Sequence, residues 1–161
     1  MKNISVIFVT SILILFLSNI STAQSKPINI ALFNPVQIFP ESTSISGIRI
    51  NLIYGKNVSM EGFDWGLVNS VGNGGVKGIQ WGFINLNDGN FLGWQSGAVN
   101  INNNNVKGFQ WGWFNKGNHV SGLQLGLINM AQSLYGIQIG LINFIETGGQ
   151  FPVFPIVNWS F

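Results

Sequence analysis

Side chains that could do chemistry are few in this sequence, and they do not cluster. The chain has one histidine, His119, in the turn-forming segment 117–119, and only five carboxylates in 161 residues. A metal site or an activated nucleophile needs several such groups together, so we interpret His119 as a solvated turn residue. Glu61 and Asp64 lie three residues apart, on opposite faces of a strand, where they cannot act together as acid and base. The sequence therefore predicts no enzyme, no metal and no cofactor.

Composition narrows the possible partners. Charged residues make up 7% of the chain and the formal net charge is +2, without a basic cluster, so no nucleic acid partner is predicted. The absence of cysteine excludes a disulfide framework. Low charge combined with thirteen Phe and six Trp is typical of a β protein at a lipid surface or of a repeat array.

The first segment has the pattern of an export signal. Lys2 precedes a mostly apolar run over 4–17, and the small residues at 21–23 fit a cleavage site. We therefore expect residues 1–23 to be a signal peptide. A transmembrane anchor is the alternative, but the run carries three hydroxyl side chains and has no basic flank. Export predicts a location in the outer membrane or at the cell surface, with the periplasm or secretion as the alternative.

One repeated motif, G-φ-Q-φ-G-φ-φ-N with φ apolar, organises the rest of the chain. Its copies start 14 to 16 residues apart, at Gly47, Gly62, Gly78, Gly93, Gly108, Gly122 and Gly136. Such self-similarity indicates a repeat architecture. We expect an N-terminal leader with one degenerate repeat at 24–44, followed by a β-repeat domain at 45–161.

Each copy predicts one β-strand of about eleven residues followed by a turn. Because side chains alternate along a strand, Gln110 and the motif glycines share one face, and Trp111, Trp113 and Asn115 share the other. The core G-φ-Q-φ-G reads the same in both directions, which suits strands that run alternately up and down. The expected fold is therefore all-β, an antiparallel meander of about 8–9 single-strand repeats.

The Gln position of successive copies forms what we call the belt. Arg49 and Asp64 occupy this position in the first two copies, and adjacent antiparallel strands would bring them face to face. An isolated buried charge is costly, so this pairing indicates that the belt is enclosed, the alternative being a surface ion pair on an open sheet. The complete belt is Arg49, Asp64, Gln80, Gln95, Gln110, Gln124 and Gln138.

Two folds could enclose the belt. If the meander closes as a small β-barrel, which we expect, the belt lines the interior and the aromatic face meets lipid. An apolar band only about 16 Å tall, against the usual ~25 Å, weighs against this fold. The alternative is a β-solenoid or an open repeat sheet; in the solenoid, the aromatic face would form a dry core and the amides could form ladders.

The chain resembles a family of uncharacterised bacterial surface-repeat proteins. In that family a signal peptide is followed by a segment like PVQIFPE at 35–41, a stretch like GIRINLIYGKN at 47–57, and GLQLGLVN-type repeats. The ending FPIVNWSF at 154–161 is also similar. The resemblance implies an exported, surface- or outer-membrane-associated protein without an assigned activity or cofactor. This chain departs from the pattern where Ser96 and Ala98 replace bulky residues.

These observations predict a non-enzymatic, exported outer-membrane or cell-surface repeat protein with a structural or interaction role and the membrane as its partner. A second hypothesis is a secreted carbohydrate- or surface-binding module that uses the regularly placed Trp side chains. A third is a small pore. The sequence indicates no particular protein or glycan partner.

Overall fold

The computed structural model describes residues 25–161, and the expected signal peptide lies outside them. Within the described residues every regular element is a β-strand, so the prediction of an all-β repeat protein is confirmed. No helix in this range is long and apolar enough to cross a membrane. The elements are β1 (Lys26–Phe33), β2 (Val36–Gln37), β3 (Ser44–Asn87), β4 (Phe91–Ser96), β5 (Val99–Asn102), β6 (Val106–Thr147) and β7 (Val153–Ser160).

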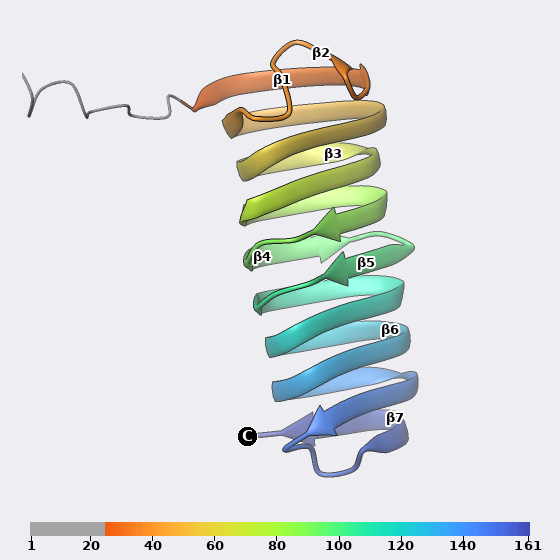
Figure 1. Cartoon of the computed structure of the whole chain (residues 1–161). Helices are drawn as coiled ribbons and strands as arrows, with labels where there is room; N and C mark the ends of the chain where they lie inside the picture. The colour runs from red at the N-terminus through yellow and green to blue at the C-terminus, as the bar shows by residue number, and fades with distance from the viewer. Residues whose placement is uncertain (1–24) are drawn as a thin grey trace, which may run out of the picture.

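The chain winds into a β-solenoid, and Figure 1 shows its coils stacked from β1 at one end to β7 at the other. Pairing between coils is parallel: Gly78 of β3 is the partner of Gly93 of β4, which in turn is the partner of Gly108 of β6. The expected antiparallel meander closed as a barrel is therefore wrong. Each repeat is one full turn of the solenoid instead of one strand, and the seven stacked glycines bound six turns.

We number the rungs 1 to 7 by these stacked glycines, from Gly47 to Gly136. Every rung contributes to two walls. The segments that stack with β4 form the β4 wall, and those that stack with β5 form the β5 wall. In rung 4 the chain leaves β4 after Ser96 and enters β5 at Val99, so the bend falls at Gly97 and Ala98, inside the motif.

This bend changes which side chains face inward. Gln110 on the β4 wall and Asn115 on the β5 wall are both fully buried, while Trp111 and Trp113 are exposed. The strict alternation expected along one continuous strand had placed Asn115 with the Trp residues, and that prediction is wrong. The two apolar residues before each motif Asn follow one another at the bend, and neither is buried in rung 4. Because two consecutive residues stay out of the interior, the alternation shifts by one position and the Asn faces inward.

The interior of the solenoid is mostly polar. One row of buried apolar side chains runs through it, two residues before each stacked glycine: Ile45, Met60, Val76, Phe91, Val106, Val120 and Leu134. The remaining inward positions are mainly Gln and Asn. The aromatic face points outward, as the barrel hypothesis had it, although the fold is the solenoid of the alternative.

The stacked glycines are required by the backbone. Gly108 has a φ of 132°, a conformation that side chains with a Cβ rarely adopt. A Cβ at this position would also overlap the carbonyl oxygen of Gly93 in the rung before it. Rungs separated by only ~4.8 Å leave no room for that atom.

The two ends of the solenoid are closed differently. At the first rung, β1 adds in parallel to β3, and β2 folds back on β1. At the last rung, β7 adds in antiparallel fashion to β6, with Asn158 opposite Gln138. Pro155 lacks a donor and Ile156 has a φ of 67°, so the backbone of β7 is irregular here. Both ends thus carry features that discourage further strand addition.

Candidate functional site

The five glutamines of the belt form a hydrogen-bonded ladder inside the β4 wall. From Gln95 onward each side-chain amide donates to the Gln in the rung before it: Nε2 of Gln95 lies 2.8 Å from Oε1 of Gln80, and Nε2 of Gln110 lies 2.9 Å from Oε1 of Gln95. Gln124 and Gln138 continue the row at 2.8 and 2.7 Å. All five are fully buried. Every donor in this row points toward the N-terminal end.

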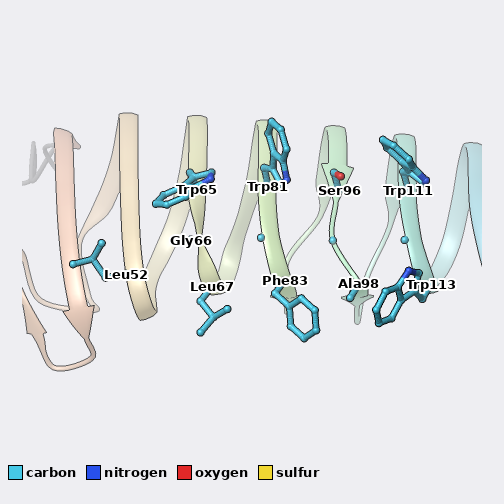
Figure 2. A pocket seen from close by; sticks show the side chains of 13 residues that line it. Leu52, Trp65, Gly66, Leu67, Trp81, Phe83, Ser96, Ala98, Trp111 and Trp113 are labelled. Carbon is cyan, nitrogen blue, oxygen red and sulfur yellow. The ribbon is translucent and has the colours of Figure 1, made fainter.

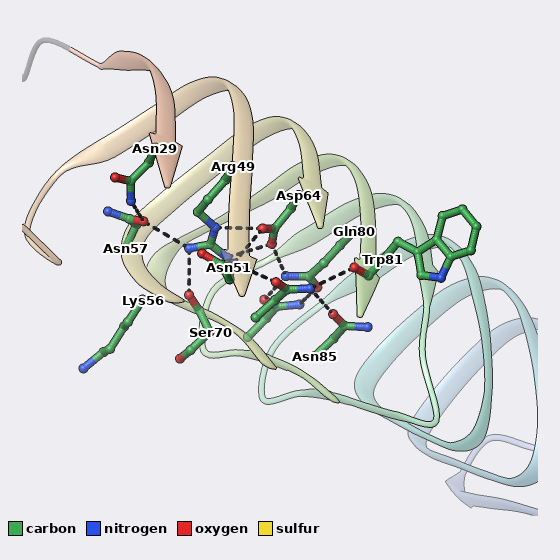
Figure 3. A network of polar contacts seen from close by, with 12 residues as sticks. Asn29, Arg49, Asn51, Lys56, Asn57, Asp64, Ser70, Gln80, Trp81 and Asn85 are labelled. Atoms are coloured by element: carbon green, nitrogen blue, oxygen red, sulfur yellow. Dashed lines mark hydrogen bonds and ion pairs between the residues drawn. The ribbon is translucent and has the colours of Figure 1, made fainter. Parts of the chain in front are cut away.

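The ladder begins on a buried ion pair, which Figure 3 shows inside the first rungs. Gln80 donates to Oδ2 of Asp64 at 2.8 Å, and Arg49 donates to both carboxylate oxygens at 2.7 Å. The remaining Arg49 nitrogen donates to the carbonyl of Ser70 at 3.0 Å. Both charged side chains are fully buried. The structure thus brings all seven belt residues into one row, across parallel rungs instead of adjacent antiparallel strands.

A second ladder, which the sequence prediction missed, runs inside the β5 wall. Asn51 donates to Asn69 at 2.7 Å, and the row continues to Asn129, which donates to Asn143 at 2.8 Å. Its members are Asn51, Asn69, Asn85, Asn100, Asn115, Asn129 and Asn143. The signal was present, because each motif copy from Gly62 onward ends in Asn. Here every donor points toward the C-terminal end, opposite to the Gln ladder.

These directions explain two buried acceptors that have no hydrogen-bond partner. Oδ1 of Asn51 lies at the start of the Asn ladder, and Oε1 of Gln138 lies at the end of the Gln ladder. In the Asn ladder each oxygen accepts from the rung before it, and in the Gln ladder each oxygen accepts from the rung after it. The oxygen at one end of each row therefore has no amide from which to accept. The unsatisfied atoms are therefore a consequence of the finite length of each ladder.

The outer surface of the β4 wall is aromatic and apolar. Trp65, Trp81 and Trp111 stand in one row, and Leu67, Phe83 and Trp113 stand in the next. A hollow of about 660 Å³ lies between these rows (Figure 2). Rung 4 contributes only small residues to it, Ser96, Gly97 and Ala98. The pair of small residues noted in the sequence therefore forms a notch in the middle of the wall.

The two long edges of the solenoid differ in polarity. The edge at the bend inside the motif carries apolar pairs such as Leu52 with Ile53 and Leu141 with Ile142, all exposed, and we call it the apolar edge. The opposite edge, where one rung leads to the next, carries exposed polar side chains, and we call it the polar edge: Asn73, Asp88, Asn90, Asn103, Asn104, Asn105, His119, Gln132 and Glu146.

Two titratable side chains at the surface, Lys77 and His119, each have one partner. Lys77 is 2.9 Å from Glu61 on the outer side of the β4 wall. The hydrogen bond and the negative charge of Glu61 raise the pKa of Lys77. Nδ1 of His119 lies 2.7 Å from the hydroxyl of Ser133. Within residues 25–161 no three His, Cys, Asp or Glu side chains come together to hold a metal ion.

No family model, curated protein or solved structure matches this chain. The resemblance to bacterial surface-repeat proteins therefore stays a prediction. The candidate site is therefore the distribution of polar and apolar side chains over the solenoid.

Proposed function

We propose that this is a non-enzymatic, exported protein of the outer membrane or cell surface, with a structural or interaction role, whose apolar edge lies in lipid. The observation that carries the proposal is the inverted polarity of the solenoid. Its Gln, Asn, Arg and Asp side chains are buried, while large apolar side chains on both sides of the apolar edge are exposed.

The exposed apolar surface extends along the whole solenoid. The largest apolar patch on a typical monomer covers about 300–600 Å² and is often functional. Here the apolar row runs from rung 1 to rung 7, with the small Ala98 at rung 4 and large side chains at the other six rungs: Leu52, Leu67, Phe83, Trp113, Leu127 and Leu141. Over six spacings of ~4.8 Å that row is about 29 Å long. Such a surface favours contact with lipid or with another apolar surface.

Backbone and side-chain hydrogen bonding supports the same location. A segment placed in lipid must satisfy its polar groups internally, because no water is available there. The parallel pairing of successive rungs satisfies the backbone, and the two amide ladders satisfy the inward amides apart from the terminal oxygens of Asn51 and Gln138. The polar edge would remain in water while the apolar edge enters the outer part of the leaflet, as an interfacial protein does.

Flotation with lipid vesicles tests this orientation. We expect the full chain to float with vesicles, and the double variant Leu52→Asp with Ile53→Asp to lose flotation, because two charges would enter the apolar edge. The matched control, Asn73→Asp with Asn90→Asp, adds the same charges to the polar edge and should float like the unmodified protein. Equal flotation of both variants would contradict the orientation, and recovery of the protein as a soluble periplasmic species would contradict the membrane location.

The alternative function, a secreted carbohydrate-binding module, would use the exposed indole rings around the hollow in the β4 wall. Trp81 and Trp111 flank Ser96 there and could stack against a sugar ring. A glycan screen with the folded protein tests this alternative. Binding that disappears in Trp111→Ser would favour it, and no binding would remove it.

A further inference from the structure

Rung 4 is the one place in the middle of the β4 wall where two neighbouring outward side chains are small. Ser96 lies between Trp81 and Trp111, and its strand partners are those two residues. Rungs 3 and 5 are about 9.6 Å apart, twice the spacing between strands. This gap admits one further aromatic ring, since stacked rings lie about 4.5–7 Å apart. The notch is therefore shaped for a side chain that this copy does not supply.

We infer that a second copy of this chain supplies it, and that two β4 walls pack face to face as a two-fold dimer. A two-fold axis that runs along the strands between rungs 4 and 5 places rung 4 of each copy opposite rung 5 of the other. Trp111 of the partner subunit then enters the notch at Ser96. Above Ala98 the ring of Trp113 already contacts Phe83 of its own copy, with ring centroids 6.2 Å apart, so the partner fills the notch at Ser96 only, and this contact occurs twice.

The remaining rungs are also complementary in size under this axis. Rung 3 lies opposite rung 6, so Trp81 faces the partner's Leu125. Rung 2 lies opposite rung 7, so Trp65 faces the partner's Ile139. At this outward position large side chains of the N-terminal half thus meet smaller ones of the C-terminal half, whereas two residues earlier Trp94 of rung 4 faces the partner's Phe109. An axis through rung 4 itself would set one notch against the other and leave a void, which costs packing energy.

Charge placement permits the same arrangement. Lys77 in rung 3 lies opposite the partner's Ser121, and Lys107 in rung 5 lies opposite the partner's Leu92. No two lysines face each other, so the like-charge repulsion that excludes wrong partners is absent. The strands of both copies run in the same direction under this axis, so both apolar edges lie on one side of the dimer.

The area of the wall is sufficient for a specific dimer. The outward rows extend about 20 Å along the strands and about 29 Å across the rungs, close to 600 Å² for each copy. Two copies together bury about 1,200 Å², the lower end of the range for stable protein interfaces. This inference goes beyond the proposed function. The row from Leu52 to Leu141 lies where the β4 wall meets the apolar edge, so the dimer would cover its side toward the wall, while the residues that follow it along the chain, such as Ile53 and Ile142, would contact lipid.

Exchanging the large and small residues tests the dimer directly. We expect the full chain, 17.6 kDa, to sediment in lipid-free buffer as two chains. Ser96→Trp fills the notch and Trp111→Ser removes the side chain that enters it, so each should raise the dissociation constant about 100-fold. The double variant, Ser96→Trp with Trp111→Ser, moves the notch to rung 5 and should restore the dimer. Trp and Ser both occur at this position in neighbouring rungs, so the fold of one chain should persist.

Three results would overturn the dimer: a single-chain mass for the unmodified protein at all concentrations, unchanged association in Ser96→Trp, or a double variant that associates as weakly as the single ones.

Cross-linking is a second test that does not depend on these variants. Ala98→Cys lies about 11 Å from its symmetry mate, given walls ~10 Å apart, and should be joined by a short bis-maleimide, whereas Gln132→Cys should not. A monomer that floats with vesicles would refute the dimer and leave the proposed function standing; a dimer that does not float would do the reverse.

Discussion

The inner and outer sides of the β4 wall follow different rules, although they belong to the same strands. On the inner side the belt position is Gln in every rung from Gln80 to Gln138. On the outer side the next residue along the chain changes freely from rung to rung, through Trp81, Ser96, Trp111, Leu125 and Ile139. An inner amide must both accept from one neighbour and donate to the other, so each rung constrains the next. An outer side chain only has to fit against its neighbours.

This difference implies that hydrogen bonding holds the interior in place to an unusual degree. In most domains buried apolar area stabilises the core, and here only one continuous row of inward side chains is apolar. A satisfied buried hydrogen bond contributes about 1 kcal/mol, whereas an unsatisfied buried group costs about 1–3 kcal/mol. Inner substitutions should therefore be far more damaging than outer ones of the same kind.

The largest effect should come from charge reversal at the start of the Gln ladder. Asp64→Arg would place two arginines together in the interior and remove an acceptor of four hydrogen bonds. Loss of one partner of a buried pair costs about 3–5 kcal/mol, and the added like charge increases this, so we expect the protein not to fold. The control is Glu61→Arg, three residues away on the outer side. Equal melting temperatures by circular dichroism would refute the inner placement of Asp64.

A smaller but still severe effect is expected at the stacked glycines. Gly108→Ala would force a Cβ against the backbone of rung 4 in a strained conformation, and we expect a loss of at least ~3 kcal/mol in the free energy of unfolding. Gly148→Ala is the matched control, because Gly148 also has a positive φ, 73°, but nothing lies within 4 Å of its would-be Cβ. Urea unfolding of both variants measures the difference. Similar losses would show that stacking does not restrict this position.

A single rung of the ladder should have an intermediate effect. Gln110→Leu removes its bonds to Gln95 and Gln124 while leaving the volume similar, and we expect a loss of about 2 kcal/mol. Its outer neighbour provides the control at protein concentrations where the chain is a monomer, since Trp111→Leu places there a residue already found at Leu125 and should change stability by less than ~1 kcal/mol. If the outer substitution is the more damaging in urea unfolding, the comparison between the two sides is wrong.

The smallest effect should come from the ion pair on the outer side. Glu61 raises the pKa of Lys77 above its ordinary value of 10.5. Because the pKa is higher in the folded state, the stability from this pair is complete below pH 10.5 and is lost as pH rises through the folded pKa. Both side chains are exposed, so solvent weakens the pair and we expect only a slight fall in melting temperature. This fall should be absent in Glu61→Gln; an equal fall in that variant would contradict the assignment.

The repeat and the enclosure of the belt could be predicted from residues alone. Alternation set Gln110 apart from Trp111, and the placement of Arg49 and Asp64 at one motif position indicated a shared buried site. Both inferences rest on local rules, the alternation of a strand and the cost of a buried charge, which hold in a barrel and in a solenoid alike. They separated the belt from the aromatic face and indicated that the belt is enclosed, without identifying what closes around it.

The path of the chain between strands could not be predicted in the same way. The symmetric core of the motif suggested strands of alternating direction, yet parallel coils accommodate it equally well. The bend at Gly97 and Ala98 has no Pro or Asn-Gly signal, so the motif read as one continuous strand. The usable sign was the motif Asn: an amide repeated at one position in each rung can form a ladder only if the rungs stack in parallel and that position faces inward.

Thiol labelling tests the inverted polarity most directly, because the sequence contains no cysteine. Three single variants are compared in the folded protein with a water-soluble maleimide: Gln110→Cys, Asn129→Cys and Ile128→Cys. The inner positions Gln110 and Asn129 are fully buried, while Ile128 is 36% exposed on the outer side. We predict rapid labelling of Ile128→Cys, and labelling of the two inner variants only after unfolding in denaturant. Rapid labelling of Gln110→Cys or Asn129→Cys in the folded protein, with Ile128→Cys protected, would contradict the polar interior.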